Sequence, residues 1–372
     1  MTLMTELLPS MNAMLALEIR GFGMPEQAST VAAEVDFVYN FITWLSIFFF
    51  VAIVGVMLYF CVKYRRGHGD NVRHAEQTST HNTPLEVTWT IIPLLLAIGI
   101  FYVGMRGYLN LRTVPANAYE IDVTAKKWSW EFNYDDEAGS ATTAALIVPV
   151  NRPVKLNMMS LDVLHSLFIP AFRVKQDIVP GRFTYHWFEA TEVGEYDLFC
   201  TEYCGTGHSD MNAKVIVVEE EEFKERIKEE AEYINRYYED KLQWAGLRIY
   251  QGRGCTQCHS LDGSEGIGPS FKQTYEMWGA ERVFADGTSA IVDENYIMSS
   301  LRNPQDQVVA NYAGAMPAQQ FKLREMIAVA RFIKSLNEVT DDAWVGLEEP
   351  ADAQMSKEEA AEAAEQAAAD EG

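Results

Sequence analysis

The sequence predicts a multidomain α+β protein in which a helical hairpin, a β-barrel or sandwich and a helical domain follow one another. Three observations lead to this prediction. Residues 37–62 and 87–105 form two long apolar runs, residues 119–218 have the pattern of short strands rich in β-branched and aromatic side chains, and residues 244–340 are helical at both ends. A chain of 372 residues also exceeds the usual size of a single domain.

The two apolar runs are predicted to be transmembrane helices. Each can cross a hydrocarbon core of about 30 Å at about 1.5 Å per residue, and Pro93 is expected to kink the second. A buried core helix is the alternative, but neither run has a polar face. The connecting loop carries Lys63, Arg65, Arg66 and Arg73, so the positive-inside rule places it in the cytoplasm. Both chain ends and the later domains are then expected on the periplasmic side of a bacterial inner membrane.

We divide the chain into six segments. The N-terminal segment is apolar without a basic start or a clear cleavage site, so it is either a signal-peptide remnant or a short interfacial helix. A charged, helix-favouring linker precedes the last domain and is expected to be a solvated connecting helix. The alanine- and glutamate-rich tail is expected to be disordered or a frayed helix. The segments are the N-terminal segment 1–30, the hairpin 31–112, the β-domain 113–218, the linker 219–243, the helical domain 244–340 and the acidic tail 341–372.

Charge and cysteine usage narrow the function. The net charge of −23 argues against nucleic acid as a partner and favours basic partners. Of five cysteines, Cys61 lies alone in the first apolar run, where it is expected to act as a small hydrophobe. The other four form two close pairs, Cys200/Cys204 and Cys255/Cys258, so none remains for a disulfide framework between distant segments. This pattern favours metal and cofactor chemistry.

The first cysteine pair lies in the stretch FCTEYCGTGHSDM, together with His208 and Met211. A disulfide between Cys200 and Cys204 is one interpretation, but it leaves the imidazole and the thioether unexplained. Thiolate, thioether and imidazole donors suit copper, and two thiolates can bridge two metal ions. Such a site needs a second histidine, and His165 in the stretch SLDVLHSLFIP is the expected partner.

These stretches resemble subunit II of the haem–copper cytochrome c oxidases, over about residues 24–218. That family carries a binuclear copper A centre in a cupredoxin barrel behind a two-helix membrane anchor. Its pattern C-x-E-x-C-x-x-x-H-x-x-M is complete in this sequence. The resemblance implies two bridging thiolates and one histidine on each copper ion. The implied ligands are His165, Cys200, the backbone carbonyl of Glu202, Cys204, His208 and Met211.

The resemblance also implies roles for residues outside the copper ligand set. Asp177 and the side chain of Glu202 resemble positions near a magnesium region at the interface with subunit I. Trp128, in KKWSWEFNY, resembles the exposed aromatic through which electrons reach copper A, and an ordinary strand aromatic is the alternative. Glu86 resembles the carboxylate at the mouth of a proton-uptake channel in subunit I, and a solvated glutamate at a helix end is the alternative.

The stretch GRGCTQCHS contains C-x-x-C-H, the attachment pattern of c-type haem. Cys255 and Cys258 would form thioethers to the haem, and His259 would be the proximal iron ligand. A thiol redox pair is the alternative, but the whole domain resembles a small class I cytochrome c. Met316, in YAGAMPA before the terminal helix, is the preferred sixth ligand. The other candidates considered are Met277, Met298 and Met326.

Together these features predict an electron-relay subunit of a caa-type respiratory terminal oxidase. The chain would pass electrons from cytochrome c, or from an upstream complex, through haem c and copper A to subunit I, where dioxygen is reduced to water with proton pumping. Subunits I and III and membrane lipid are the expected partners. A copper A subunit of a nitric oxide reductase and a membrane-tethered carrier without an attached enzyme are the alternatives.

Overall fold

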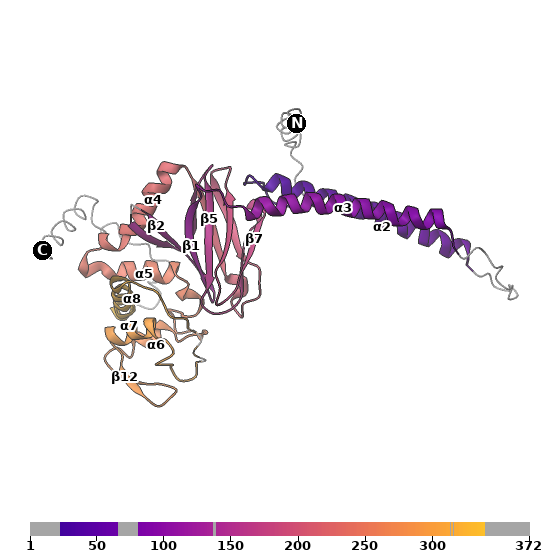
Figure 1. The fold of residues 1–372 in the computed structure, drawn as a ribbon. Helices are drawn as coiled ribbons and strands as arrows, with labels where there is room; N and C mark the ends of the chain where they lie inside the picture. The colour runs from indigo at the N-terminus through magenta and orange to yellow at the C-terminus, as the bar shows by residue number, and fades with distance from the viewer. Residues whose placement is uncertain (1–22, 66–80, 137–138, 313, 315, 339–372) are drawn as a thin grey trace. The chain divides into compact units, whose positions relative to one another are not determined.

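The computed structural model describes residues 23–65, 81–136, 139–312, 314 and 316–338 (Figure 1). The chain divides into two compact units. The first contains the hairpin with residues 170–173 and 187–191, and the second contains the remaining β-domain, the linker and the helical domain. The start of the predicted N-terminal segment, most of the basic loop and the acidic tail lie outside the described residues.

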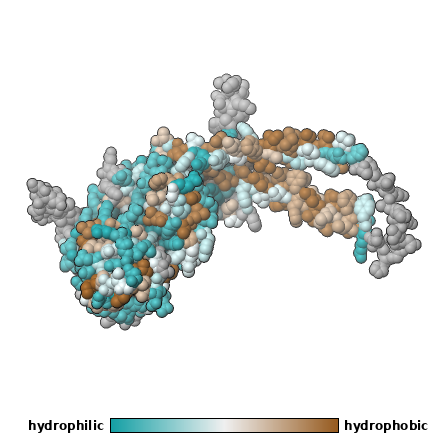
Figure 2. Space-filling view, turned by 60° about the horizontal axis from the view of Figure 1, so that its bottom comes forward, coloured by the Kyte–Doolittle hydropathy of each residue, from teal (hydrophilic) through white to brown (hydrophobic). Residues whose placement is uncertain are grey.

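The hairpin consists of α2 (Ala32–Lys63) and α3 (Thr83–Arg112), which lie side by side (Figure 1). The side chain of Asn82 accepts a hydrogen bond from the first turn of α3, and the helix continues through Pro93. Both helices expose many large apolar side chains, and the face seen in Figure 2 is largely brown. Both helices are long and apolar enough to span a membrane. Because so large an apolar surface is unfavourable in water, the hairpin is the membrane segment of the chain.

The start of α2 is tied to residues 170–173 of the same unit by a buried ion pair. Nε of Arg173 lies 2.8 Å from Oδ1 of Asp36, and their side chains are 4% and 0% exposed. The guanidinium also donates to the carbonyls of Pro25 and Pro170, and the amide of Gln27 donates to Asp36. Every charged group here is paired, which is the condition under which buried charges are tolerated.

The β-domain is a sandwich of two five-stranded sheets within the described residues, with strand orders β3-β2-β1-β5-β8 and β4-β10-β9-β6-β7. Most neighbouring strands are antiparallel, but β1 pairs with β5 and β4 pairs with β10 in parallel. Inward-facing residues such as Val123, Phe132 and Leu156 are fully buried between the sheets. The strands are β1 (Tyr119–Lys126), β2 (Ser129–Asp136), β3 (Gly139–Thr143), β4 (Leu146–Pro149), β5 (Pro153–Ser160), β6 (His165–Ile169), β7 (Val174–Ile178), β8 (Thr184–Glu189), β9 (Gly194–Cys200) and β10 (Asn212–Val218).

The charged linker forms α4 (Glu220–Glu232), which is less solvated than the sequence suggested. Phe223 and Ile227 are each 1% exposed. The ring of Phe223 packs against those of Tyr119 and Tyr134, at centroid distances of 5.2 and 6.2 Å. One apolar stripe therefore anchors this charged helix to the β-domain.

The helical domain contains one core in which α5 and α8 cross closely. A side chain at Gly246 of α5 would place its Cβ 2.1 Å from the carbonyl oxygen of Ala328 in α8. A short two-stranded sheet of β11 and β12 adds to the predicted all-α arrangement. The elements are α5 (Leu242–Gly252), α6 (Phe271–Tyr275), β11 (Glu281–Val283), β12 (Ser289–Ile291), α7 (Glu294–Arg302) and α8 (Leu323–Ser335). The predicted order of hairpin, β-sandwich and helical domain is confirmed.

Candidate copper and haem sites

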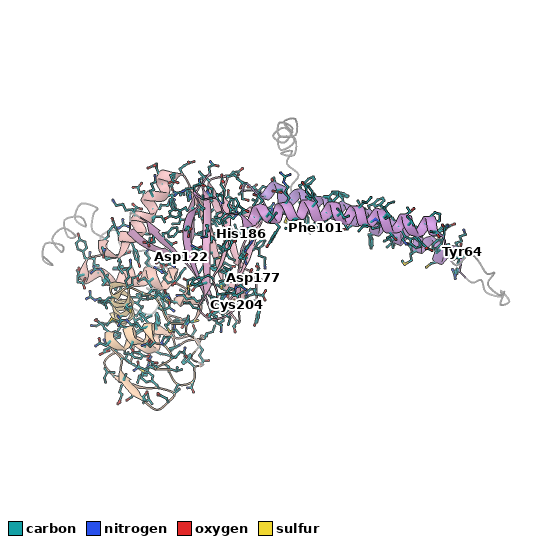
Figure 3. All side chains as sticks on the ribbon, in the orientation of Figure 1. Tyr64, Phe101, Asp122, Asp177, His186 and Cys204 are labelled. Carbon is teal, nitrogen blue, oxygen red and sulfur yellow. The ribbon has the colours of Figure 1, made fainter. Side chains whose placement is uncertain are left out.

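The predicted copper ligands converge where the chain turns back between β9 and β10, a loop that includes Cys204 (Figure 3). Cys200 is the last residue of β9, and His165 is the first residue of β6. These strands are antiparallel neighbours, and the N–H of Thr201 donates to the carbonyl of Ser166 at 3.0 Å. The register of the sheet therefore brings a distant histidine against the cysteine loop.

The two thiols of the loop are not joined. The Sγ atoms of Cys200 and Cys204 lie 3.9 Å apart and both cysteines are free, whereas a disulfide bond is about 2.05 Å long. Nδ1 of His165 lies 3.9 Å from Sγ of Cys200. The ligand atoms of these three residues all fall within 4.8 Å of one another. This arrangement favours a metal site over the disulfide alternative.

The other predicted donors surround the same sulfurs. Nδ1 of His208 lies 3.4 Å and Sδ of Met211 lies 3.8 Å from Sγ of Cys204. The carbonyl oxygen of Glu202 lies 3.4 Å from Sγ of Cys200. Two thiols, two imidazoles and a thioether form a donor set suited to copper. The residues present therefore fit the metal that the sequence predicts.

Hydrogen bonds and burial set the charge of this site. Nε2 of His165 lies 2.8 Å from Oδ1 of Asp162, which fixes the ring with Nδ1 toward the sulfurs. Burial disfavours the thiolate of Cys200, but hydrogen bonds from His165 and the backbone outweigh it and lower the pKa of this thiol. Burial and the neighbouring Cys200 thiolate raise the pKa of Cys204. A bound cation would stabilise both thiolates.

Two tryptophans hold the loop in place. Nε1 of Trp128 donates to the carbonyl of Cys204 at 3.2 Å, and Nε1 of Trp130 donates to the carbonyl of Met211 at 3.3 Å. The indole of Trp128 packs so closely on the loop that a Cβ at Gly207 would lie 2.7 Å from the ring. Trp128 is only 6% exposed, in contrast to the exposed aromatic that the resemblance implied.

The remaining predicted positions of this region lie outside the sulfur cluster. Asp177 on β7 accepts hydrogen bonds from Ser166 at 2.7 Å and Lys175 at 2.9 Å, and both lower the pKa of its carboxyl group. Its carboxylate and that of Glu202 are not members of the three-residue ligand group found in the described part of the chain. Glu86 lies in the first turn of α3, where its carboxylate accepts the N–H of Asn82 at 3.0 Å. The magnesium and proton-channel roles stay predictions.

The haem motif forms a tight turn directly after α5. Cys255 opens a short 3-10 helix, and Cys258 and His259 follow it. Nδ1 of His259 hydrogen-bonds to the carbonyl of Pro269 at 2.7 Å, which leaves Nε2 as the nitrogen able to bind iron. The imidazole stacks on Phe271 at a centroid distance of 4.8 Å. Burial lowers its pKa and therefore favours the neutral, metal-binding form.

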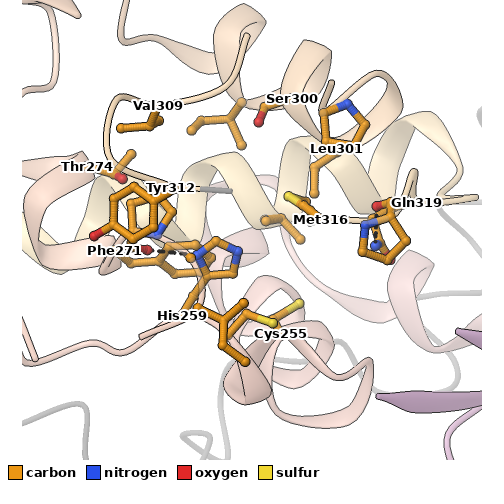
Figure 4. A pocket seen from close by; sticks show the side chains of 18 of the residues that line it. Cys255, His259, Phe271, Thr274, Ser300, Leu301, Val309, Tyr312, Met316 and Gln319 are labelled. Atoms are coloured by element: carbon orange, nitrogen blue, oxygen red, sulfur yellow. Dashed lines mark hydrogen bonds between the residues drawn. The ribbon is translucent and has the colours of Figure 1, made fainter. Parts of the chain in front are cut away.

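These residues open into a mostly apolar pocket, shown in Figure 4. His259, Cys255 and Met316 all line it. The other candidate methionines, Met277, Met298 and Met326, are described residues but do not line it. Met326 is 2% exposed and belongs to the core of the helical domain. The pocket therefore fits a covalently attached haem and favours Met316 among the candidates.

Comparison with known proteins agrees with this geometry. Residues 18–105 match the family described as cytochrome c oxidase subunit II, transmembrane domain, and residues 140–220 match its periplasmic domain. Residues 244–337 match the cytochrome c family. The chain belongs to the cytochrome c oxidase subunit II family, with a cytochrome c domain at its C-terminal side.

Relatives within this family include subunit 2 of the cytochrome c oxidase of Alkalihalophilus pseudofirmus, 29% identical over 80% of this chain and 86% of the relative. Subunit 2 of the cytochrome c oxidase of Cereibacter sphaeroides is 29% identical over 55% of this chain and 78% of the relative. Among solved structures, the comparison finds the periplasmic domain of subunit II of the cytochrome oxidase of Bradyrhizobium japonicum. Its sequence is 30% identical to this chain, the TM-score is 0.31, and the match covers 32% of this chain and 99% of that one.

Within this subunit II fold, sequence reasoning found the donors but missed the residues that hold them. Asp162 orients His165, and its place three residues earlier in the same loop was the available signal. Trp130 lies on β2 and Trp128 in the turn before it, and no sequence pattern indicated that the indole of Trp130 also holds the loop.

Proposed function

We propose that the chain is the electron-relay subunit of a respiratory terminal oxidase of the caa type. The chain would accept electrons at its cytochrome c domain and deliver them through its cupredoxin domain to subunit I, where dioxygen is reduced to water with proton pumping. A c-type haem and a binuclear copper centre would each supply reversible one-electron chemistry when bound. The haem ligands would come from the haem motif described above. The copper ligands would be His165 and the donors of the sulfur loop, which is the stretch from Cys200 to Met211 between β9 and β10.

One observation carries this proposal: the turn between β1 and β2 contacts both sites. On one side, Trp128 donates to the carbonyl of Cys204 in the sulfur loop. On the other side, a Cβ at Gly254 would lie 2.5 Å from Cβ of Ser129, so the haem-attachment turn rests directly on this hairpin. The residue that follows Gly254 is Cys255. A short path of protein atoms in contact thus joins the two candidate cofactor sites.

The chain's own residues would keep these sites rigid and dry. His165 is held by Asp162, the sulfur loop is held by two indole N–H groups, and Cys200 and Cys204 are 7% and 4% exposed. A rigid, water-excluded site has little to rearrange when its charge changes by one electron. The burial of Trp128 supports electron transfer from the chain's own cytochrome domain rather than from an outside protein docked on that ring.

The proposal extends to location and partners. Haem attachment to C-x-x-C-H outside the cytoplasm and the basic hairpin loop both favour periplasmic redox domains on a bacterial inner membrane. The net charge of −23 favours a basic cytochrome c as the external donor. We place Asp177 and Glu202 at a magnesium region facing subunit I and Glu86 at a proton-channel mouth, with subunit III as a further partner.

The test is spectroscopy and metal analysis of the full chain purified with its membrane partners. We expect a low-spin c-type haem spectrum, a mixed-valence dicopper electron-spin-resonance signal, and dioxygen uptake with reduced cytochrome c. Nitric oxide consumption without dioxygen uptake would instead assign the chain to a reductase. Purification without any large integral partner would identify a tethered carrier. A disulfide between Cys200 and Cys204 in the loaded complex would contradict the copper centre.

A further inference from the structure

Four charged side chains are buried together where the haem-attachment turn meets the β1–β2 hairpin. Lys126 ends β1, Glu131 lies on β2, Arg253 caps α5 and Glu325 lies in the first turn of α8. Their side chains are 2%, 6%, 8% and 9% exposed. Buried charges of this kind are costly unless each has a partner.

The charges alternate, so each has an opposite neighbour. Nζ of Lys126 lies 2.6 Å from Oε1 of Glu131, and a guanidinium nitrogen of Arg253 lies 3.7 Å from the same carboxylate oxygen. Arg253 also reaches Oε1 of Glu325 at 3.3 Å. The same ammonium of Lys126 donates to Oε1 of Gln319 at 2.6 Å. The charges of the four groups sum to zero. Two contacts join the β-domain to the cytochrome domain, that of Arg253 with Glu131 and that of Lys126 with Gln319.

We propose that this four-residue cluster, which we call the docking cluster, holds the cytochrome domain in the one register that allows fast electron transfer to the sulfur loop. This inference rests on the proposed function. Lys126 and Arg253 each stand two residues from a residue of the electron path, Trp128 and Cys255. Both basic residues also line the haem pocket with Ser129.

The docking cluster fixes the position of the cytochrome domain more than it strengthens the binding of that domain to the β-domain. Each domain contributes one acid and one base, so separated domains would each keep one ion pair. Docking adds the ion pair of Arg253 with Glu131 and the hydrogen bond from Lys126 to Gln319. Any other register would lose the contacts of Arg253 with Glu131 and of Lys126 with Gln319, or place like charges together. Because electron tunnelling weakens steeply with distance, a small loss of register has a large effect on rate.

The experiment compares variants in the purified oxidase complex after rapid photoreduction of the haem. Lys126→Met leaves Glu131 and Gln319 without their shared cation, so we expect transfer from the haem to copper to slow at least about tenfold. Lys126→Arg should retain the rate within about twofold because the cation is kept. Lys214→Met removes an exposed ion pair of the same domain, whose side chains are 56% and 57% exposed, and should leave the rate unchanged.

Measurements other than the transfer rate distinguish a loss of domain positioning from a loss of folding. Copper content, haem content and both spectra should stay as in the unaltered complex for Lys126→Met, while hydrogen exchange rises at the β1–β2 turn and at residues 253–259. If Lys126→Met fails to assemble, Gln319→Leu removes an interdomain hydrogen bond while all three ion pairs remain, and a slower rate is again expected.

The outcomes distinguish this inference from the proposed function. An unaltered complex that holds both cofactors but shows no transfer between them would contradict the proposed relay itself. If the unaltered complex transfers electrons and both Lys126→Met and Gln319→Leu match its rate and exchange, only the docking cluster is overturned. An equal loss of rate in Lys214→Met would also overturn it, because surface charge would then be sufficient.

Discussion

The sulfur loop and the haem turn solve the same problem, the positioning of metal-binding side chains, in different ways. The sulfur loop depends on sheet register, because His165 comes from a strand thirty-five residues before Cys200. The haem turn contains Cys255, Cys258 and His259 in one short stretch of chain, directly after a helix. The comparison shows that a local motif needs only a rigid turn, whereas a non-local site needs a whole sandwich to form first.

The two sites also differ in what orients the histidine. His165 is held by a carboxylate, that of Asp162, whereas His259 is held by a backbone carbonyl, that of Pro269. A side-chain partner can be removed by one substitution. A backbone partner cannot, so the haem turn is expected to tolerate single substitutions around its histidine better than the sulfur loop does.

The largest expected effect separates the two sites completely. If the sulfur loop holds the proposed copper centre, Cys200→Ser should abolish its signal while haem content stays unchanged, because a serine oxygen is a much poorer copper ligand than a thiolate. The double variant Cys255→Ser/Cys258→Ser should lose covalent haem while copper stays bound. Metal analysis and optical spectra of the purified complexes measure both. Loss of both cofactors in either variant would show that the sites fold as one cooperative unit.

The next effect concerns the packing beneath the haem turn. Gly246→Ala would force a methyl group against the carbonyl of Ala328 and Cβ of Phe332 at 2.1 and 2.6 Å, and we expect a loss of about 3 kcal/mol in the free energy of unfolding of the cytochrome domain. Gly252→Ala in the same helix meets no heavy atom within 4 Å and is the matched control. Thermal unfolding followed at the haem band measures the difference. Equal midpoints would contradict the close helix crossing.

A smaller effect tests the side-chain brace of the sulfur loop. Asp162→Asn keeps the shape but removes the charge that orients His165, so copper affinity is expected to fall about 10- to 100-fold. Asp197→Asn, which affects only the exposed pair with Lys214, is the control. Competition with a copper chelator measures the affinity. An unchanged value for Asp162→Asn would mean that the sandwich alone fixes the imidazole.

Features that depend on local sequence were predictable, whereas features that depend on distant contacts were not. The haem motif was predictable because its spacing is local, and the hairpin because its apolar runs are long enough to span a bilayer core. The candidate copper donors were predicted from residue types, but the residues that hold them were not, because Trp130 and Asp162 act through contacts that only the folded register creates. The burial of Trp128 also could not be read from the sequence, since Gly205 and Gly207, which lie against its ring, are more than seventy residues later in the chain.

The smallest effect is a contrast in salt dependence between the two electron-transfer steps. The first step brings an outside basic donor to a chain of net charge −23, and its attraction is screened as the Debye length shortens from about 30 Å at 0.01 M to about 8 Å at 0.15 M salt. We expect its second-order rate to fall about tenfold over this range.

The second step depends on the docking cluster, whose charges are at most 9% exposed and therefore poorly screened. Its first-order rate should change by less than about twofold. Stopped-flow mixing measures the first step and photoreduction the second. A second step that slows in parallel with the first would mean that the cytochrome domain docks through its surface charge.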